Sequence, residues 1–258
     1  MAYIDMSFKS ETLTREVQIQ VMLPSHEGFG NDVYPCRTLY FLHGFNGNGA
    51  ELTRFLPLMV QSMLKGMAIV LCDGDNSFYA DKKDGISNYR KFVEEELVEV
   101  TRALFPLSHR REETFIGGIS MGGHGAIVSG FSQTNIFSKI AVLSPCINFY
   151  EVTALDETPF TEAALNPIFG SREQYENSDQ CCMGAAKKAL QDEKMIPSIF
   201  IGCGKQDPLI YGQQRRFAEW LKENNIPVVH KETEGAHDIF VWRDMLDDTF
   251  DFLAGYEG

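Results

Sequence analysis

The sequence predicts an α/β protein in which a mostly parallel central sheet is covered by helices on both faces. Short apolar runs recur along the 258-residue chain, and segments with the spacing of amphipathic helices separate them. A strand that is apolar along its whole length has no polar side to present to water, so we expect both faces of its sheet to be buried. The length suits one domain, and no linker, repeat or low-complexity tract divides the chain.

The first expected strand differs from the others. Residues 12–23 alternate between polar and apolar side chains, which is typical of an antiparallel edge or hairpin strand. The later strands are shorter and mostly apolar, as expected for the buried, parallel part of a sheet. We expect them at residues 38–42, 67–72, 114–119, 138–143, 197–202 and 228–232.

Helical spacing of apolar residues predicts the segments that cover the sheet. Within residues 89–105, for example, Phe92, Val93 and Leu97 fall on one helical face, and Glu99 falls on the opposite face. We expect helices at residues 51–64, 89–105, 121–132, 211–224 and 239–253.

One long segment interrupts this alternation of strands and helices. Residues 146–195 have a mixed composition and contain Pro159, Pro167 and Gly170. Segments of this length inside a compact domain are more often functional than idle. We therefore interpret 146–195 as a cap-like insertion above the strand ends, within a single domain that spans residues 1–258.

The acidic charge balance disfavours several classes of partner. The formal net charge is −13 and the pI is near 4.9. A surface of this charge repels nucleic-acid phosphates and anionic lipid, so we expect neither nucleic acid nor a membrane as a partner. The chain has no apolar run of the roughly 18 residues that a membrane span needs, and its charged N-terminus lacks the apolar region of a signal peptide.

The cysteines and acidic residues give no sign of a disulfide framework or a metal site. The six cysteines are scattered and form no CxxC pair, which favours buried free thiols and a cytoplasmic location. The fragment Asp73-Gly74-Asp75-Asn76 resembles half of a calcium loop, but the glycine and the distal glutamate of such a loop are missing. We interpret this fragment as a polar turn, and we expect no metal and no organic cofactor.

Residues 118–122 read Gly-Ile-Ser-Met-Gly, the G-x-S-x-G pattern. The motif follows an expected strand and opens an expected helix, which is the context of the nucleophile elbow of α/β-hydrolases. The sharp turn holds the serine at its tip, and the two glycines let the strand and the helix approach each other closely. The pattern predicts Ser120 as a nucleophile; the alternative is a glycine-rich turn without chemistry. The fingerprints of dinucleotide-binding and phosphate-binding loops do not fit the glycines of this chain.

The general base is expected among the six histidines of the chain. In this fold the acid follows the serine and the histidine comes last, which excludes the three histidines before Ser120. His124 lies on the helix that the elbow opens, where we expect it to pack, and His230 lies inside an expected strand. His237 lies in a turn between the last strand and the last helix, from which it can reach the serine. The order therefore predicts His237 as the base, against the alternative of a surface histidine.

The acid is expected just after another strand. Asp207 follows the strand at 197–202 in a turn flanked by glycine and proline, so it can accept a hydrogen bond from the base and stabilise its charged form. Asp238 is adjacent to the histidine in sequence, and neighbouring side chains rarely achieve that geometry. The alternative for Asp207 is a cap of the helix at 211–224.

Acyl transfer also needs two N–H donors that face the developing oxyanion. One donor is the backbone N–H of the residue after the nucleophile, here Met121. The other comes from the loop after an early strand, and residues 42–49 (LHGFNGNG) fit that loop. We expect Phe45 to supply the second donor; the alternative is a plain flexible turn.

Together these motifs resemble the esterase D-like, tributyrin esterase family of α/β-hydrolases, which includes acetyl and feruloyl esterases and S-formylglutathione hydrolases. The resemblance runs from about residue 12 to residue 253. It rests on residues 42–45 with Gly47, on Phe78, Tyr79 and Asp81, on residues 114–123, on Gly204 with Asp207, and on His237 with Trp242.

The resemblance implies a Ser120, His237, Asp207 triad, with the backbone amides of Phe45 and Met121 as the oxyanion hole. It also implies short-chain acyl esters, including acetylated and feruloylated sugars, as substrates. From their aromatic side chains we expect Phe45 and Trp242 to line a small apolar pocket that contacts the substrate. Two positions depart from the family pattern. Ile239 stands where many members have a second aromatic residue, and Ala236 stands where glycine is common.

The combined prediction is a serine carboxylesterase that acts on small-molecule esters through an acyl-enzyme intermediate. The same scaffold and triad also suit an S-formylglutathione hydrolase-like thioesterase or an acyltransferase. A catalytically silent binding protein of this fold is a further alternative, but such a protein would typically have lost a member of the triad, and none is lost here.

Overall fold

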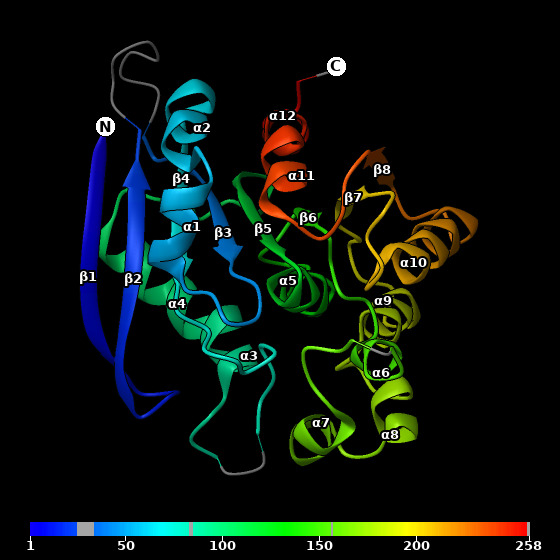
Figure 1. Ribbon diagram of the computed structural model, residues 1–258. Coiled ribbons are helices and arrows are strands. Elements are labelled where there is room, and N and C mark those ends of the chain that lie inside the picture. Colours follow the sequence, from blue (N-terminus) through cyan, green and yellow to red (C-terminus); the bar gives the residue numbers. More distant parts are fainter. Residues whose placement is uncertain (25–33, 83–84, 156, 257–258) are drawn as a thin grey trace.

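The computed structural model describes residues 1–24, 34–82, 85–155 and 157–256, and an eight-stranded sheet forms its centre (Figure 1). The strand order is β1-β2-β4-β3-β5-β6-β7-β8. The six strands from β3 to β8 run parallel, and β2 pairs antiparallel with β4 at one side. The strands are β1 (Ala2–Ser10), β2 (Arg15–Leu23), β3 (Arg37–Leu42), β4 (Met67–Cys72), β5 (Thr114–Ile119), β6 (Lys139–Leu143), β7 (Ser198–Gly204) and β8 (Val228–Thr233). The predicted fold class is therefore confirmed.

Strand β1 was not expected from the sequence. It forms a hairpin with β2, in a register that pairs Ala2 with Leu23 and Ser10 with Arg15. Ile4, Met6 and Phe8 face the protein along β1 but stay partly exposed. Residues 4–9 alternate between apolar and polar side chains, as expected for a half-buried edge strand, so the sequence carries a signal for β1 although the predicted strand began at residue 12.

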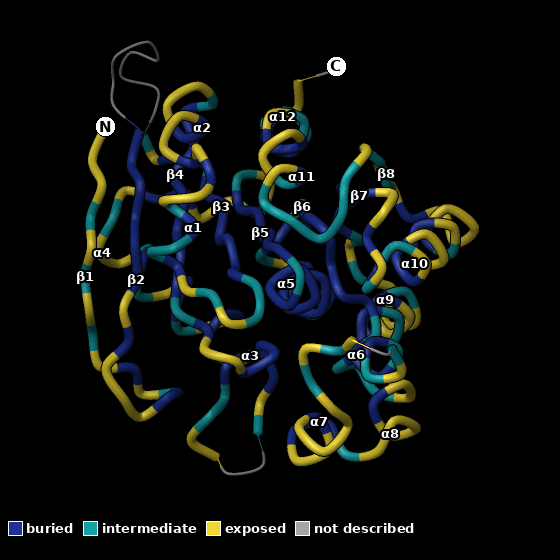
Figure 2. Tube along the Cα trace, in the orientation of Figure 1, coloured by how far each residue is buried: buried dark blue, intermediate teal, exposed yellow. Residues whose placement is uncertain are grey.

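Helices form a layer on each face of the sheet. Neighbouring strand residues such as Tyr40 and Phe41 face opposite layers, and each layer has its own apolar core. One layer contains α1 (Gly49–Phe55), α2 (Leu58–Lys65), α11 (Ile239–Asp244) and α12 (Leu246–Ala254). The other contains α4 (Leu97–Leu104), α5 (Met121–Ser132), α9 (Cys182–Gln191) and α10 (Tyr211–Glu223), and Figure 2 shows that α5 is almost wholly buried.

Two of the expected helices are divided, and a third contains a π-helical turn. The helix expected at 51–64 is divided into α1 and α2 at Pro57, and Leu56 before the proline is extended, as proline sterics favour. The helix expected at 239–253 is divided into α11 and α12 at Met245. The helix expected at 89–105 is continuous and consists of α3 (Tyr89–Lys91), a π-helical turn (Phe92–Glu96) and α4.

The segment 146–195 folds into four short helices. They are α6 (Phe149–Val152), α7 (Glu162–Phe169), α8 (Arg172–Glu176) and α9. Figure 1 places α6, α7 and α8 beyond the carboxyl ends of the parallel strands. The same edge of the sheet carries the turn at Ser120, so this segment lies near the predicted nucleophile.

Among the described residues, three further properties concern membrane-spanning helices, disulfides and metal-binding groups. None of the described helices is long and apolar enough to cross a membrane. All six cysteines are buried and free. Within the described parts of the chain, no group of three or more His, Cys, Asp or Glu side chains is placed to hold a metal ion.

The end of β3 and the start of α5 approach each other closely at Gly122. A Cβ atom at this position would lie 2.3 Å from the carbonyl oxygen of Leu42 and 2.5 Å from that of His43. Backbone atoms cannot move aside as the end of a flexible side chain can, so only glycine fits here.

We expect Gly122→Ala to lower the free energy of unfolding by about 1–3 kcal/mol, because it overpacks a rigid contact. Gly212→Ala is the matched control. Gly212 lies in α10, where a Cβ would meet only the end of the Arg216 side chain at 3.4 Å, so added helix propensity should stabilise the protein by roughly 0.5–1 kcal/mol. Thermal or denaturant unfolding measures both changes, and equal effects of the two variants would contradict the packing argument.

His124 is buried under the helices of the 146–195 segment. Its Nε2 atom shares a hydrogen bond of 2.8 Å with the Tyr175 hydroxyl, and its ring lies 4.3 Å from that of Phe149. Burial lowers the pKa of His124 to about 3. The histidine is therefore neutral in the folded protein, in the packing role that its position on α5 predicted.

This burial predicts that His124 destabilises the protein in acid. Its folded pKa is depressed, so the unfolded chain takes up the proton first, and stability is lost as the pH falls from about 6.5 towards 3. In this range the slope of the free energy of unfolding against pH should be smaller in His124→Gln than in the wild type. The difference between the two slopes should be at most about 1.4 kcal/mol per pH unit. Urea unfolding at several pH values tests this, and identical slopes for the two proteins would refute it.

Candidate active site

Ser120 lies at the sharp turn between β5 and α5. Its backbone has φ 55° and ψ −114°, which is a strained conformation for a residue with a side chain. The turn is held on both sides: the Ser120 N–H donates to the Leu143 carbonyl at 3.0 Å, and the Ser120 carbonyl accepts from the His124 N–H at 3.1 Å. These contacts fix the side chain at the carboxyl edge of the sheet.

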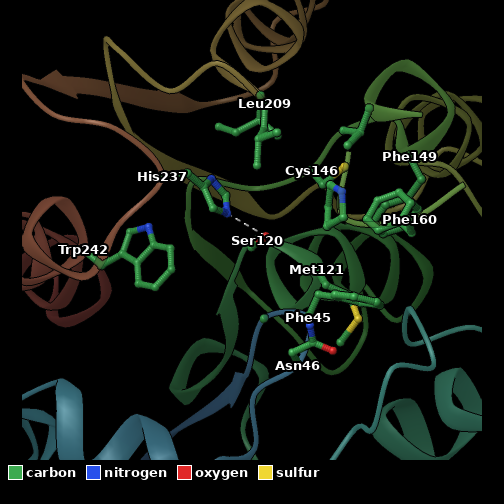
Figure 3. Close-up of a pocket in the computed structure, with 14 residues that line it drawn as sticks. Phe45, Asn46, Ser120, Met121, Cys146, Phe149, Phe160, Leu209, His237 and Trp242 are labelled. Atoms are coloured by element: carbon green, nitrogen blue, oxygen red, sulfur yellow. Dashed lines mark hydrogen bonds between the residues drawn. The ribbon is translucent and has the colours of Figure 1, made fainter. Parts of the chain in front are cut away.

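A continuous chain of hydrogen bonds joins Ser120, His237 and Asp207. His237 Nε2 lies 2.9 Å from Ser120 Oγ, and His237 Nδ1 lies 2.6 Å from Asp207 Oδ2. Because a carboxylate can only accept, Nδ1 carries the proton, and Nε2 is left to accept the hydroxyl proton of Ser120. Figure 3 shows the imidazole of His237 directed at the serine.

Asp207 is held rigidly and away from water. Its side chain is fully buried. Oδ1 accepts the backbone N–H groups of Leu209 and Ile210 at 3.0 and 3.2 Å, while Oδ2 faces His237. The aspartate therefore both caps the turn before α10 and contacts the histidine, so the two alternatives from the sequence are compatible.

The loops that carry Asp207 and His237 are tied to each other. The Gln206 N–H donates to the Gly235 carbonyl at 2.9 Å, and the Lys205 N–H donates to Thr233 at 2.8 Å. These bonds continue the pairing of β7 and β8 past the ends of the strands. They fix the distance between two side chains that are 30 residues apart in sequence.

The N–H groups of Phe45 and Met121 have no hydrogen-bond partner among the described residues. Phe45 lies in the loop after β3, and Met121 is the first residue of α5. The two residues lie beside Ser120 in the same cavity. Both donors are therefore available to an oxygen atom bound at the serine.

The loop of Phe45 depends on residues whose role the sequence did not reveal. Buried His43 donates from Nδ1 to the Gly44 carbonyl at 2.7 Å, and its Nε2 accepts the Gly74 N–H at 2.7 Å. Burial lowers the pKa of His43, which keeps Nε2 free to accept. Asn46 and Asn76 are joined by two further hydrogen bonds of 2.7 and 2.8 Å. The polar turn at residues 73–76 thus positions this loop.

Ser120 opens into an apolar cavity of about 220 Å³, which we call the Phe160 cavity. Phe45 lies beside Phe160, with ring centroids 5.5 Å apart, and Phe160 packs against Phe149 at 5.8 Å. These aromatic rings come from the loop after β3 and from the 146–195 segment, and Figure 3 shows Phe149 and Phe160 on one side of the serine. The residues that line the cavity are Gly44, Phe45, Asn46, Ser120, Met121, Cys146, Phe149, Val152, Pro159, Phe160, Leu209, Ile210, His237 and Trp242.

Trp242 lies on the other side of His237 (Figure 3). Its indole N–H donates to Ser144 Oγ at 3.1 Å, and its ring meets the imidazole of His237 edge-on, with centroids 5.5 Å apart. Ser144 is buried at the end of β6 and was not expected at the site. His230 lies in β8, apart from this cluster, with Glu232 Oε1 3.9 Å from its Nε2.

Comparisons with known proteins identify the family of the chain. A family model described as "Putative esterase" matches residues 10–253. An acetyl esterase of Caldicellulosiruptor saccharolyticus is 31% identical over 263 aligned positions, which cover 98% of both chains. An S-formylglutathione hydrolase of Rattus norvegicus is 28% identical over 58% of this chain and 50% of its own length.

Solved structures extend the agreement to the whole chain. FphF, a fluorophosphonate-binding serine hydrolase of Staphylococcus aureus, superposes with a TM-score of 0.87 at 28% identity and covers 98% of both chains. The S-formylglutathione hydrolase FrmB of the same organism superposes with a TM-score of 0.85, also at 28% identity and over 98% of both chains. The resemblance predicted from the motifs is thereby confirmed. The chain belongs to this esterase family and is a serine carboxylic ester hydrolase of the α/β-hydrolase fold.

Proposed function

We propose that Ser120, His237 and Asp207 hydrolyse short-chain acyl esters through an acyl-enzyme intermediate. The observation that carries this proposal is the unbroken hydrogen-bond chain from Ser120 to the buried Asp207, which ends at an apolar cavity. A serine hydroxyl is a weak nucleophile alone, and a positioned base activates it.

In the first step, the Ser120 hydroxyl attacks the ester carbonyl while His237 Nε2 takes its proton. The imidazolium that forms is stabilised by Asp207, which has no solvent contact to weaken the interaction. The negative charge on the carbonyl oxygen is stabilised by the N–H groups of Phe45 and Met121. The alcohol leaves with the proton from His237.

In the second step, a water molecule takes the place of the alcohol. His237 removes a proton from the water, which attacks the acyl group on Ser120, and the same two N–H groups stabilise the second oxyanion. Collapse of this intermediate releases the carboxylic acid and returns the proton to Ser120. No metal or organic cofactor takes part.

The proposed acyl site is the Phe160 cavity, with the 146–195 segment as a cap-like insertion of the single domain. The aromatic walls and the volume of about 220 Å³ suit a short acyl chain. The acetyl esterase with 31% identity over nearly the whole chain supports the same size range.

Ser120→Ala should abolish hydrolysis of p-nitrophenyl acetate while the fold stays intact. Loss of a triad nucleophile typically lowers kcat by about 10⁶-fold. Ser129→Ala is a matched control in the same helix, because Ser129 is buried and its hydroxyl has no partner among the described residues. A phosphonate ester should label the wild type and Ser129→Ala, but not Ser120→Ala. More than a few per cent of residual activity in Ser120→Ala would mean that another residue is the nucleophile.

The size of the cavity predicts how the rate depends on acyl chain length. With p-nitrophenyl esters of two to twelve carbons, we expect kcat/KM to fall beyond about four carbons. Each buried methylene would add about 0.8 kcal/mol of binding free energy, but the aromatic wall leaves no space to bury further methylenes. In Phe160→Ala, which removes part of the wall, the optimum should move to longer chains. A steady rise through the longer esters in the wild type would overturn the short-chain assignment.

A further inference from the structure

A second cavity opens on the other side of the oxyanion loop. It has a volume of about 420 Å³, and we call it the Glu51 cavity. It shares Gly44, Phe45, Asn46 and Trp242 with the Phe160 cavity. The remaining residues that line it are His43, Gly47, Asn48, Glu51, Leu52, Phe55, Ile119 and Ile239.

The residues shared by the two cavities lie next to the nucleophile. A Cβ atom at Gly44 would lie 3.4 Å from Ser120 Cβ, so this shared wall touches the serine. Trp242 and Phe160 lie on opposite sides of Ser120 in Figure 3. An ester bound at Ser120 can therefore extend its two halves into different cavities.

Glu51 is the acidic residue of the second cavity, and its carboxylate is unpaired. Oε2 would lie 3.3 Å from a Cβ atom at Gly47, so the carboxylate is close to the oxyanion loop. The Glu51 side chain makes no hydrogen bond or ion pair with any described residue; only its backbone N–H is bound, by Asn48 Oδ1 at 2.8 Å.

The positive end of the α1 backbone lies near this carboxylate, because Glu51 is in the first turn of the helix. No lysine or arginine is among the described residues that line either cavity. Asp73 lies next to the cavity, where Oδ1 accepts the Gly49 N–H at 2.8 Å. The imidazole of His43 also lines the cavity, and burial lowers its pKa, so it adds no positive charge.

We propose that the Glu51 cavity is the leaving-group subsite and that Glu51 selects alcohols that are neutral hydrogen-bond donors or cations, against anionic ones. This inference rests on the proposed esterase function. The acyl chain occupies the Phe160 cavity, because placing alkyl carbons beside an unpaired carboxylate would remove water from the charge at a large cost.

We expect the leaving-group preference of this chain to differ from that of relatives that act on acylated glutathione. Glutathione carries a net negative charge, and its carboxylates would approach Glu51 in a cavity without a cation. A hydroxyl or ammonium group would instead donate to the carboxylate, with Trp242 and half-exposed Phe55 as apolar walls beside it. The leaving group thus restricts the substrate class further, beyond the limit on acyl length.

A purely structural role for Glu51 would leave substrate choice unchanged. Glu51 lies in the first turn of α1, where a negative charge stabilises the helix N-terminus. Glu173 lies in the first turn of α8 and is exposed, away from both cavities. Glu173→Gln therefore removes the same charge at the same kind of helical position.

The test uses three aryl acetates that carry a carboxymethyl, hydroxymethyl or trimethylammoniomethyl group para to the ester. The wild type should hydrolyse the cationic ester with a kcat/KM at least about 10-fold above that of the anionic ester, with the neutral ester between them. Because salt shortens the screening length from about 10 Å at 0.1 M to about 3 Å at 1 M, this ratio should shrink in 1 M NaCl.

Variants then assign the preference to one residue. Glu51→Gln should lower the cation-to-anion ratio about 10-fold and remove its salt dependence, and Glu51→Lys should reverse the preference. The neutral ester corrects each variant for any change in folding or in the triad. Glu173→Gln should keep the wild-type ratio.

Two failures are distinguishable. If the wild type hydrolyses p-nitrophenyl acetate but the ratio is the same in the wild type and in Glu51→Gln, the subsite assignment is wrong and the esterase function stands. If the wild type hydrolyses none of the acetates, the proposed function is wrong and this inference fails with it.

Discussion

The strained turn at Ser120 is the constraint on which the rest of the site depends. A left-handed backbone with a side chain persists only where its surroundings hold it, and here β6 and α5 do so through hydrogen bonds to Leu143 and His124. The turn also brings α5 against the end of β3, where Gly122 leaves no space for a Cβ. The oxyanion loop that follows β3 therefore lies beside Ser120 because of the same contact that positions the serine.

The polar groups around Ser120 are held in place by two buried side chains, one fully hydrogen-bonded and one neutral. Asp207 has no solvent contact, but three hydrogen-bond partners satisfy its carboxylate, so the charge stays in place at low desolvation cost. His43 holds the oxyanion loop through two short bonds that only a neutral imidazole can make. Pre-organisation of this kind lets the proposed oxyanion donors act without rearrangement during the reaction.

The two cavities lie next to each other, but the residues that line only one of them differ in chemical character. The Phe160 cavity is bounded by aromatic side chains from the 146–195 segment, whereas the Glu51 cavity has an unpaired carboxylate on a helix of the core fold. In the proposed function, variation within residues 146–195 changes acyl preference chiefly through the Phe160 cavity. A change in α1 can alter leaving-group preference while the triad stays intact.

Local patterns of hydrophobicity and glycine in the sequence predicted strands β2 to β8 and the elbow, and the chain order of the triad in this fold then predicted Asp207 and His237. The prediction left out β1, although residues 4–9 alternate as an edge strand does, and it left out the break of the last helix at Met245. Only the tertiary structure decided the contacts of His43 and Ser144, because their partners are distant in sequence: Gly74 is 31 residues from His43, and Trp242 is 98 residues from Ser144. The cavity beside Glu51 likewise forms from separate segments of the chain. Such contacts arise when strands and loops meet at one edge of the sheet, and no local pattern encodes them.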